Sequence, residues 1–481
     1  TRQPPPSPPL PDYLTFTVPL NHSNPTHGNL TLRALPYISA SAQSTSSQQS
    51  IVELLAQSPV LIVYTGNEGS VQGYWDDSGY ARDLADHFGG SALYIEHRYF
   101  GESLPFGNAS FSRDNIRWLS VEAALDDYAS IVTEVVSASP GDGPFVVAIG
   151  GSYGGMLATY ARFAHPSTFH GAVAASAPIA MIDRDSFVPD PPYFTAVTNN
   201  LAEADARCAD IIRAGFSDLL ALYAKNDTTS IRNAFQICEG TPVPDAWTLQ
   251  QWAQTAIGTS LGMGNNPWAA NWVAPLPAWP APFVCTKLIL PQASTPLAAL
   301  ADTARVSVFG YPASACADIR REYVECADAS GCGAGGPSAV AWDYLACTQL
   351  HYAPTTNNVT DMFPEDGWNA TTRDAYCART WGTPSDSWTS FAATFNVSAI
   401  MEGASRIIFS NFVHDPWSGG GIRYGKEERQ LLVTSAADGA HHADLWSESA
   451  TEPPSIAAVH AAELAAVERW VLEGKEWKGT N

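Results

Sequence analysis

A short turn between a predicted strand and a predicted helix constrains the fold of this chain more than any other segment. The sequence GGSYG at 150–154 follows the apolar run PFVVAIG at 144–150 and precedes the helix-forming stretch MLATYARFAH. In such G-x-S-x-G turns small residues flank the serine because the backbone is tight and strained, and the hydroxyl projects beyond the strand. A glycine-rich turn around an ordinary serine is the alternative. The flanking strand and helix favour a nucleophile at Ser152, with the N–H of Tyr153 as an oxyanion donor.

Apolar runs typical of buried strands alternate with amphipathic stretches on both sides of this turn. Strands are predicted at 59–66, 91–98, 144–150, 171–178, 405–411 and 429–436, and helices at 120–135 and about 455–474. This alternation indicates a mainly parallel sheet with helices on both faces. Together with the turn at Ser152 it predicts the α/β-hydrolase fold.

The strand pattern is interrupted by a long segment of different composition. All eight cysteines lie there, and 199–224 is predicted to be helical. We therefore predict a first core segment at 1–182, an inserted helical cap domain at 183–394 and a second core segment at 395–481. The even number of cysteines predicts disulfide bonds and an oxidising compartment, although their pairing cannot be derived. A metal site is the weaker alternative because no C-x-x-C occurs.

The catalytic partners of Ser152 should follow late strands, because the order in this fold is serine, acid, histidine. Asp415 follows the strand predicted at 405–411, and His441 follows the one at 429–436. An aspartate in this position fixes the tautomer of the imidazole, which takes the serine proton. This acyl-transfer chemistry requires no metal and no cofactor.

Neighbouring residues leave alternatives open at this stage. His442 is as suitable a base as His441 from the pattern alone, and Asp438 and Asp444 flank the pair. His414 adjoins Asp415, which could itself be an ordinary turn residue before a proline.

Charge and glycosylation motifs limit the environment and the partners of the chain. There are 25 Lys and Arg against 48 Asp and Glu, so the formal net charge is −23 and nucleic acid is not an expected partner. The charge suits an acidic compartment, where part of it is neutralised. No apolar run is long enough to span a membrane, and the start at Thr1 is consistent with a removed leader. Seven N-x-S/T sequons, at Asn21, Asn29, Asn108, Asn226, Asn358, Asn369 and Asn396, predict an N-glycosylated protein that is secreted or lysosomal/vacuolar.

Several longer segments resemble the lysosomal Pro-Xaa carboxypeptidase and dipeptidyl peptidase II family of serine peptidases. They extend from about residue 59 almost to the end, and they are YTGNEGS, EHRYFGESLPFG, GGSYGGML, PLPAWP, WDYLACT, NNVTDMF, DPWSGGG and GAHHADL. The segments WDY and NNVTDMFP resemble dipeptidyl peptidase II more closely. The resemblance implies an α/β-hydrolase core with a helical cap, a homodimer as one possible assembly, and cleavage after proline in peptides with proline near a terminus.

The same resemblance implies roles for individual residues. It assigns the triad to Ser152, Asp415 and His441, the first histidine of the pair. It places a second oxyanion donor at or near Asn67, and it implies a Cys347–Cys377 disulfide. The residues implied to line a proline pocket are Met156, Tyr352 and Trp417.

Asp343 is the most informative position for the mode of cleavage. By the resemblance, the matching aspartate of the dipeptidyl peptidases binds the free α-amine of the substrate, which an N-blocked peptide lacks. The sequence thus favours release of N-terminal Xaa-Pro or Xaa-Ala dipeptides. The alternatives are a Pro-Xaa carboxypeptidase, with Arg320 or Arg321 for the terminal carboxylate, a prolyl endopeptidase, a lipase or esterase, and an inactive binding protein. Asp343 could also serve only as a helix cap or a structural partner.

Overall fold

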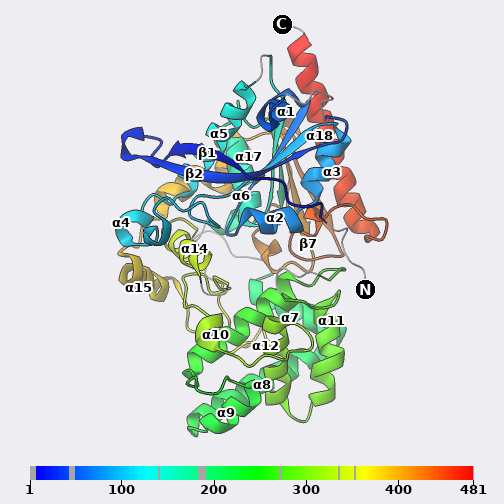
Figure 1. Ribbon diagram of the computed structural model, residues 1–481. Coiled ribbons are helices and arrows are strands. Elements are labelled where there is room, and N and C mark those ends of the chain that lie inside the picture. Colours follow the sequence, from blue (N-terminus) through cyan, green and yellow to red (C-terminus); the bar gives the residue numbers. More distant parts are fainter. Residues whose placement is uncertain are drawn as a thin grey trace.

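A twisted central sheet forms the core of the computed structural model, which describes residues 7–42, 49–138, 141–182, 191–269, 274–333, 336–350 and 354–479. Within these residues the sheet has eight strands in the order β1-β2-β4-β3-β5-β6-β7-β8 (Figure 1). The strands are β1 Leu14–Pro19, β2 Asn29–Ile38, β3 Val60–Thr65, β4 Ser91–Ile95, β5 Phe145–Gly151, β6 Gly171–Ala175, β7 Ile407–Phe412 and β8 Leu431–Ala436. β2 pairs antiparallel with both β1 and β4, and all other neighbours are parallel. This is an α/β-hydrolase fold.

Alternating side chains of the parallel strands pack against helices on the two faces of the sheet. Leu61 and Val63 of β3 join one hydrophobic cluster, whereas Val60 and Ile62 join another on the opposite face. The first face is covered by α5 (Val121–Ser137) and α6 (Tyr153–Ala164), and the second by α2 (Val71–Asp77), α3 (Tyr80–His87) and α18 (Pro454–Gly479). Every residue of β3 is buried, as expected for a strand covered on both faces.

The strands predicted from the sequence are present, and α5 begins after Ser120, whose side chain caps it by accepting from Ala123 N. The β1–β2 hairpin was not predicted. The stretch predicted as helical at 199–224 is divided at Asp205, whose extended backbone ends α7 (Tyr193–Ala204) and whose carboxylate caps α8 (Ala206–Ala224).

Between β6 and β7 the described residues contain helices and no strand of the sheet. The first group has its own hydrophobic core and comprises α7, α8, α9 (Thr228–Phe235), α10 (Ala246–Ile257), α11 (Pro280–Val284), α12 (Pro296–Phe309) and α13 (Ile319–Glu322). It forms the lower lobe in Figure 1. The later helices are α14 (Pro337–Thr348), α15 (Ala370–Trp381), α16 (Thr389–Phe395) and α17 (Val397–Gly403).

The segment predicted as one insertion therefore packs in two ways. Leu345 of α14 and Phe391 and Phe395 of α16 belong to the same hydrophobic cluster as α6 of the core. The first boundary of the predicted cap, at 182/183, coincides with the edge of the described residues. Within those residues no helix is both long and apolar enough to cross a membrane.

Four disulfides join the cysteines of this segment. They are Cys208–Cys285, Cys238–Cys316, Cys326–Cys332 and Cys347–Cys377, and the last is the pair that the family resemblance implied. The first two each close a loop of more than 70 residues inside the first helical group. Loops of this length restrict the unfolded chain strongly, so these bonds stabilise the folded cap.

Replacing Cys238 and Cys316 together by serine should destabilise the cap by about 2–5 kcal/mol. The core sheet and the turn at Ser152 should keep their structure, since neither cysteine contacts them. Thermal unfolding measured by calorimetry should show a lower-temperature transition. Covalent labelling of Ser152 by a fluorophosphonate should persist below that transition. Loss of labelling in a variant that still unfolds at the wild-type temperature would contradict this expectation.

Candidate active site

Ser152 occupies a strained turn between β5 and α6. Its backbone has φ 58° and ψ −127°, a conformation that costs roughly 1–3 kcal/mol for a residue with a side chain. The turn is held by a hydrogen bond from Ser152 N to Ala175 O of β6 at 2.9 Å. A Cβ on Gly150 would lie 2.4 Å from the Gly154 carbonyl oxygen, and one on Gly151 would lie 2.6 Å from Leu445. Only glycine therefore fits on the strand side of the serine.

Asp415 and His441 meet beyond the ends of β7 and β8. The Nδ1 atom of His441 lies 3.0 Å from Oδ1 of Asp415, and both side chains are almost fully buried. The same carboxylate oxygen accepts a hydrogen bond from Trp417 N at 2.9 Å, which fixes its orientation. His441 Nε2 is buried and has no hydrogen-bond partner among the described residues. The imidazole is thus oriented by an acid on one side and available to take a proton on the other.

The neighbouring candidates have other partners. The ring of His442 is tilted against that of His441, with ring centroids 4.6 Å apart. Burial, and then the charge of the adjacent His441, lowers the pKa of His442 well below its usual value. His414 contacts Asn200, and Asp438 accepts from Ser455 at 2.7 Å. Of the two adjacent histidines, His441 is the one paired with Asp415.

The loop of His441 is also held by the first helical group of the insertion. His441 N donates to Met263 O at 3.2 Å, and Ala440 N donates to Asn266 Oδ1 at 2.7 Å. Next to the acid, the ring of Trp417 packs edge-on against Tyr193 of α7 with centroids 4.9 Å apart. Acid and base are therefore positioned by both lobes.

The start of α6 and the loop after β3 lie against each other next to Ser152. Tyr153 is the first residue of α6, and Asn67 lies in the loop after β3, where this fold places its second oxyanion donor. A Cβ on Gly154 would be 3.2 Å from the Asn67 side chain, so this loop lies against the turn. Tyr128 OH donates to Gly66 O at 2.6 Å and holds the loop in place.

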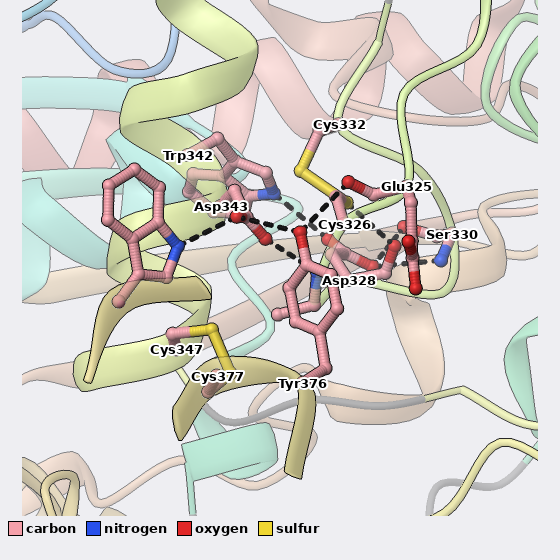
Figure 2. The surroundings of a disulfide bond; sticks show 12 residues. Glu325, Cys326, Asp328, Ser330, Cys332, Trp342, Asp343, Cys347, Tyr376 and Cys377 are labelled. Atoms are coloured by element: carbon pink, nitrogen blue, oxygen red, sulfur yellow. Dashed lines mark hydrogen bonds between the residues drawn. A yellow bond between two sulfur atoms is a disulfide. The ribbon is translucent and has the colours of Figure 1, made fainter. Parts of the chain in front are cut away.

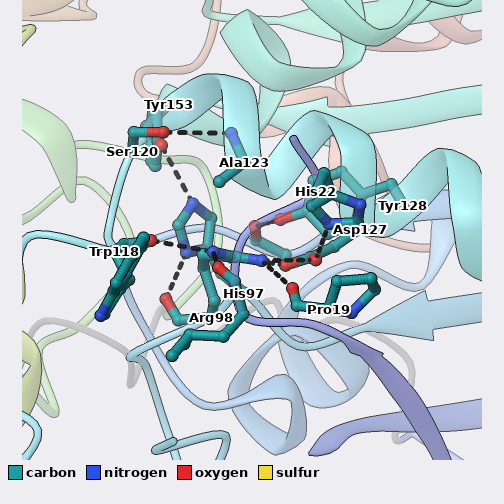
Figure 3. A network of polar contacts seen from close by, with 12 residues as sticks. Pro19, His22, His97, Arg98, Trp118, Ser120, Ala123, Asp127, Tyr128 and Tyr153 are labelled. Carbon is teal, nitrogen blue, oxygen red and sulfur yellow. Dashed lines mark hydrogen bonds and ion pairs between the residues drawn. The ribbon is translucent and has the colours of Figure 1, made fainter. Parts of the chain in front are cut away.

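A buried polar network holds the Tyr153 side chain (Figure 3). His97 Nδ1 lies 2.6 Å from the Arg98 carbonyl oxygen, and its Nε2 lies 3.0 Å from Tyr153 OH. Burial lowers the pKa of His97 to about 4, so the ring is neutral. Since Nδ1–H donates to the carbonyl, Nε2 accepts a hydrogen bond from Tyr153 OH. Arg98 is in turn bound by Asp127 through two contacts of 2.6 Å. The network fixes the first turn of α6, and with it the Tyr153 N–H.

A cavity of about 260 Å³ opens beside Ser152. Its walls are mostly apolar and include Met156, Pro178, Met181, Ile182, Met263, Trp342, Leu350 and Trp417. Met156 and Trp417 are thus placed as the resemblance implied. Tyr352, the third residue of the implied pocket, lies outside the described residues.

Two carboxyl groups lie in the same wall. Glu68 adjoins Asn67, and its Oε2 is buried without a hydrogen-bond partner among the described residues. Asp328 accepts from Ser330 N and Oγ at 2.9 and 2.7 Å and from Trp342 Nε1 at 3.0 Å. Burial raises the pKa of both carboxyl groups. The described lining residues include no lysine, arginine or histidine.

Asp343 has a different environment from the one predicted. Its carboxylate accepts from Ala327 N at 2.7 Å, from Tyr376 OH at 3.0 Å and from Trp381 Nε1 at 2.8 Å. Figure 2 shows it on α14 among these donors, whereas Asp328 lies in the loop closed by Cys326–Cys332. Asp343 is absent from the described lining of the cavity. The placement is that of a structural partner and does not match the predicted contact with substrate.

The comparisons with known proteins agree with this geometry. Residues 53–463 match the family model described as Serine carboxypeptidase S28. The chain belongs to this family. The mouse Lysosomal Pro-X carboxypeptidase is 33% identical over 420 residues, a match that covers 86% of this chain and 82% of the mouse protein. The human Lysosomal Pro-X carboxypeptidase is 32% identical over 421 residues, which cover 86% of this chain and 81% of the human protein. The Prolyl carboxy peptidase like protein 5 of Caenorhabditis elegans is 27% identical over 446 residues, covering 86% and 83%.

As an S28 family member, the chain is a serine peptidase. Similarity to solved structures is remote: the Proline iminopeptidase of Mycobacterium smegmatis has a TM-score of 0.37 and 13% identity, covering 96% of this chain and all of that one. The assignment therefore rests on the sequence family.

Sequence reasoning missed several residues of this S28 site. Glu68 lies inside the segment YTGNEGS, and His97 lies inside EHRYFGESLPFG, so both were within segments that carried the resemblance. Asp328 lies between two cysteines only six residues apart, a spacing that signals a tight loop. None of the three has a local pattern that shows which side chains face the nucleophile.

Replacing Tyr153 by phenylalanine should lower both stability and turnover. The change leaves the buried Nε2 of His97 without a donor, which costs about 1–3 kcal/mol. It also loosens the turn that presents the oxyanion donor, so kcat should fall more than KM changes. Thermal unfolding and steady-state kinetics check this. Wild-type kcat in a correctly folded variant would show that the network does not position the oxyanion site.

Proposed function

We propose that this chain is a proline-specific exopeptidase that removes Xaa-Pro or Xaa-Ala dipeptides from the N-terminus of peptides. Ser152, Asp415 and His441 act as the catalytic triad. Tyr153 N–H and a donor at Asn67 form the oxyanion hole. The single observation that favours this mode is the charge of the cavity beside Ser152, where two carboxyl groups and no basic side chain lie among the described lining residues.

The proposed reaction is an acyl transfer in two steps. His441 Nε2 takes the proton of Ser152 as the hydroxyl attacks the carbonyl carbon after proline, while Asp415 stabilises the imidazolium that forms. The oxyanion accepts hydrogen bonds from the two N–H donors. His441 then protonates the leaving amine, and the ester to Ser152 is hydrolysed by water activated in the same way.

The apolar part of the cavity suits a proline ring. The ring carries no N–H, so it needs no acceptor in the wall. Met156 and Met181 are flexible thioethers that can adapt to its shape, and Trp417 supplies a flat wall next to the triad acid.

The acidic part of the cavity suits the substrate amine. An ammonium group placed between Glu68 and Asp328 would neutralise two carboxylates that burial otherwise disfavours, forming charge-assisted hydrogen bonds. Asp328 has the more rigid position, because Ser330 and Trp342 fix both of its oxygens. We assign the amine contact to Asp328 with Glu68 in place of Asp343, whose oxygens already have donors.

Cleavage of a C-terminal residue after proline is the second candidate, favoured by the names of the mammalian relatives. It requires a donor-rich or cationic group for the terminal carboxylate. Arg320 and Arg321 are exposed on α13 and do not belong to the described lining of the cavity. The geometry therefore supports this mode less than the first.

The two modes are separated by comparing a free-amine Xaa-Pro fluorogenic amide with its N-acylated counterpart and with an N-blocked Pro-Xaa peptide. The free amine should be preferred at least tenfold in kcat/KM, with Ser152→Ala inactive on all three. Faster cleavage of the N-blocked Pro-Xaa peptide would assign carboxypeptidase action, and efficient cleavage of the acylated amide would assign endopeptidase action.

Asp328→Asn should raise KM for the free-amine substrate about tenfold or more and leave the acylated substrate unaffected, because the lost contact is to a charge. Asp343→Asn is the matched control: it should lower stability without changing this preference. If Asp343→Asn abolished the preference for the free amine and Asp328→Asn did not, Asp343 would be the residue that binds the substrate amine.

The wild-type preference should also weaken in acid. Burial raises the pKa of Asp328, and only its ionised form attracts the ammonium, so KM for the free-amine substrate should rise as pH falls through this raised value. KM of the acylated substrate should lack this rise. A pH series of KM for both substrates checks the difference.

A further inference from the structure

A second pair of carboxyl groups lies outside the described lining of the cavity and close in the chain or fold to the loop of His441. Asp444 belongs to the short helix η9 (Ala443–Leu445), three residues after His441, and Glu463 belongs to α18. Both side chains are fully buried. The two carboxyl groups are within hydrogen-bonding reach of each other. Both oxygens of Glu463 and Oδ1 of Asp444 are buried and have no other hydrogen-bond partner among the described residues. Neither the triad nor the cavity uses this pair.

Asp444 joins three elements that determine where His441 lies. Its Oδ2 accepts a short hydrogen bond from Ser410 Oγ of β7, the strand that leads to Asp415. Its backbone carbonyl accepts from His460 Nε2 of α18 at 2.8 Å. The loop of the base is thus tied through Asp444 to the strand of the acid and to the C-terminal helix.

The charges around the pair cannot neutralise two carboxylates. His460 is the nearest cationic group, and its Nδ1 lies 3.2 Å from Glu452, so its charge is already paired. From α3, Tyr80 stacks on His460 and donates to its carbonyl oxygen. From the loop of the base, His442 is neutral because burial lowers its pKa. Ser410 supplies a neutral hydroxyl, and no lysine or arginine among the described residues forms an ion pair with Asp444 or Glu463.

We propose that Asp444 and Glu463 share one proton and act as positioning residues for His441. At acidic pH the protonated pair holds the loop of His441 in place, and loss of the proton releases this loop. Two adjacent buried carboxyl groups without a cation cannot both be ionised. Burial raises the pKa of both groups, and the neighbouring Asp444 raises that of Glu463 further. The inference rests on the proposed role of His441 as the base.

The pH dependence has a definite sign. Because the pKa of Glu463 is higher in the folded chain than in the unfolded chain, folding binds a proton above about pH 4.5. Stability is therefore fully present below the unfolded value and falls as pH rises through the folded value. Loss of the shared proton therefore limits activity on the alkaline side.

The test uses Glu463→Gln, because its amide can donate to Asp444 at every pH and so replaces the shared proton. Two pH profiles are measured between pH 4 and 9: the melting temperature, and the rate at which a fluorophosphonate labels Ser152. In wild type both should decline toward alkaline pH. In Glu463→Gln the melting temperature should decline less, and the alkaline limb of labelling should shift upward by at least one pH unit.

Asp444→Asn provides a second variant, since its amide can donate to Glu463 while its carbonyl accepts from Ser410, and it should shift both profiles in the same direction. Glu468→Gln is the control, because it makes the same change on an exposed part of α18 and should leave both profiles unchanged. The proposal would be overturned if the pH profiles of both variants coincided with those of wild type. It would also be overturned if the melting-temperature profile shifted and the labelling profile did not. Absence of labelling in wild type at every pH would instead refute the proposed triad.

Discussion

The strained backbone of Ser152 is the constraint on which the rest of the site depends. A positive φ at a non-glycine residue is unfavourable, and it persists here because the packing around the turn fixes the backbone in this conformation. Gly150 and Gly151 allow β5 to approach its neighbours closely, and Ala175 of β6 accepts the serine N–H. The loops after β7 and β8 meet through the contact between Asp415 and His441, and the loop after β3 lies against the turn through Asn67. In the proposed mechanism these loops supply the acid, the base and an oxyanion donor.

Burial determines the protonation of the groups that support this centre. His97 is neutral because it is fully enclosed, and its neutral ring accepts a hydrogen bond from Tyr153 OH. Arg98 and Asp127 are also enclosed, but they neutralise each other through two short contacts. A buried pair of opposite charges and a buried neutral imidazole therefore lie next to the first turn of α6. Removing one partner of such a network is costly, because the remaining group stays buried without compensation.

Carboxyl groups around the cavity differ in their partners. Burial raises the pKa of both Glu68 and Asp328, and the described lining of their cavity contains no basic side chain. Asp343, fifteen residues from Asp328, has three protein donors and is absent from that described lining. The family segment WDY is prominent in the sequence, whereas no motif marks Asp328, so the proposed amine contact of Asp328 depends on the three-dimensional arrangement.

The sequence alone determined the parts of this protein that depend on local order. The alternation of apolar strands and helices and the glycines around Ser152 are features of neighbouring residues, and they led to the α/β-hydrolase fold. The tertiary structure decided what depends on residues distant in sequence. It paired Asp415 with His441 instead of His442, it divided the predicted insertion between two hydrophobic clusters, and it placed Glu68 beside a cavity that also contains Asp328. The physical reason is that burial and charge pairing arise from side chains brought together by folding, and spacing along the chain does not encode which of them will meet.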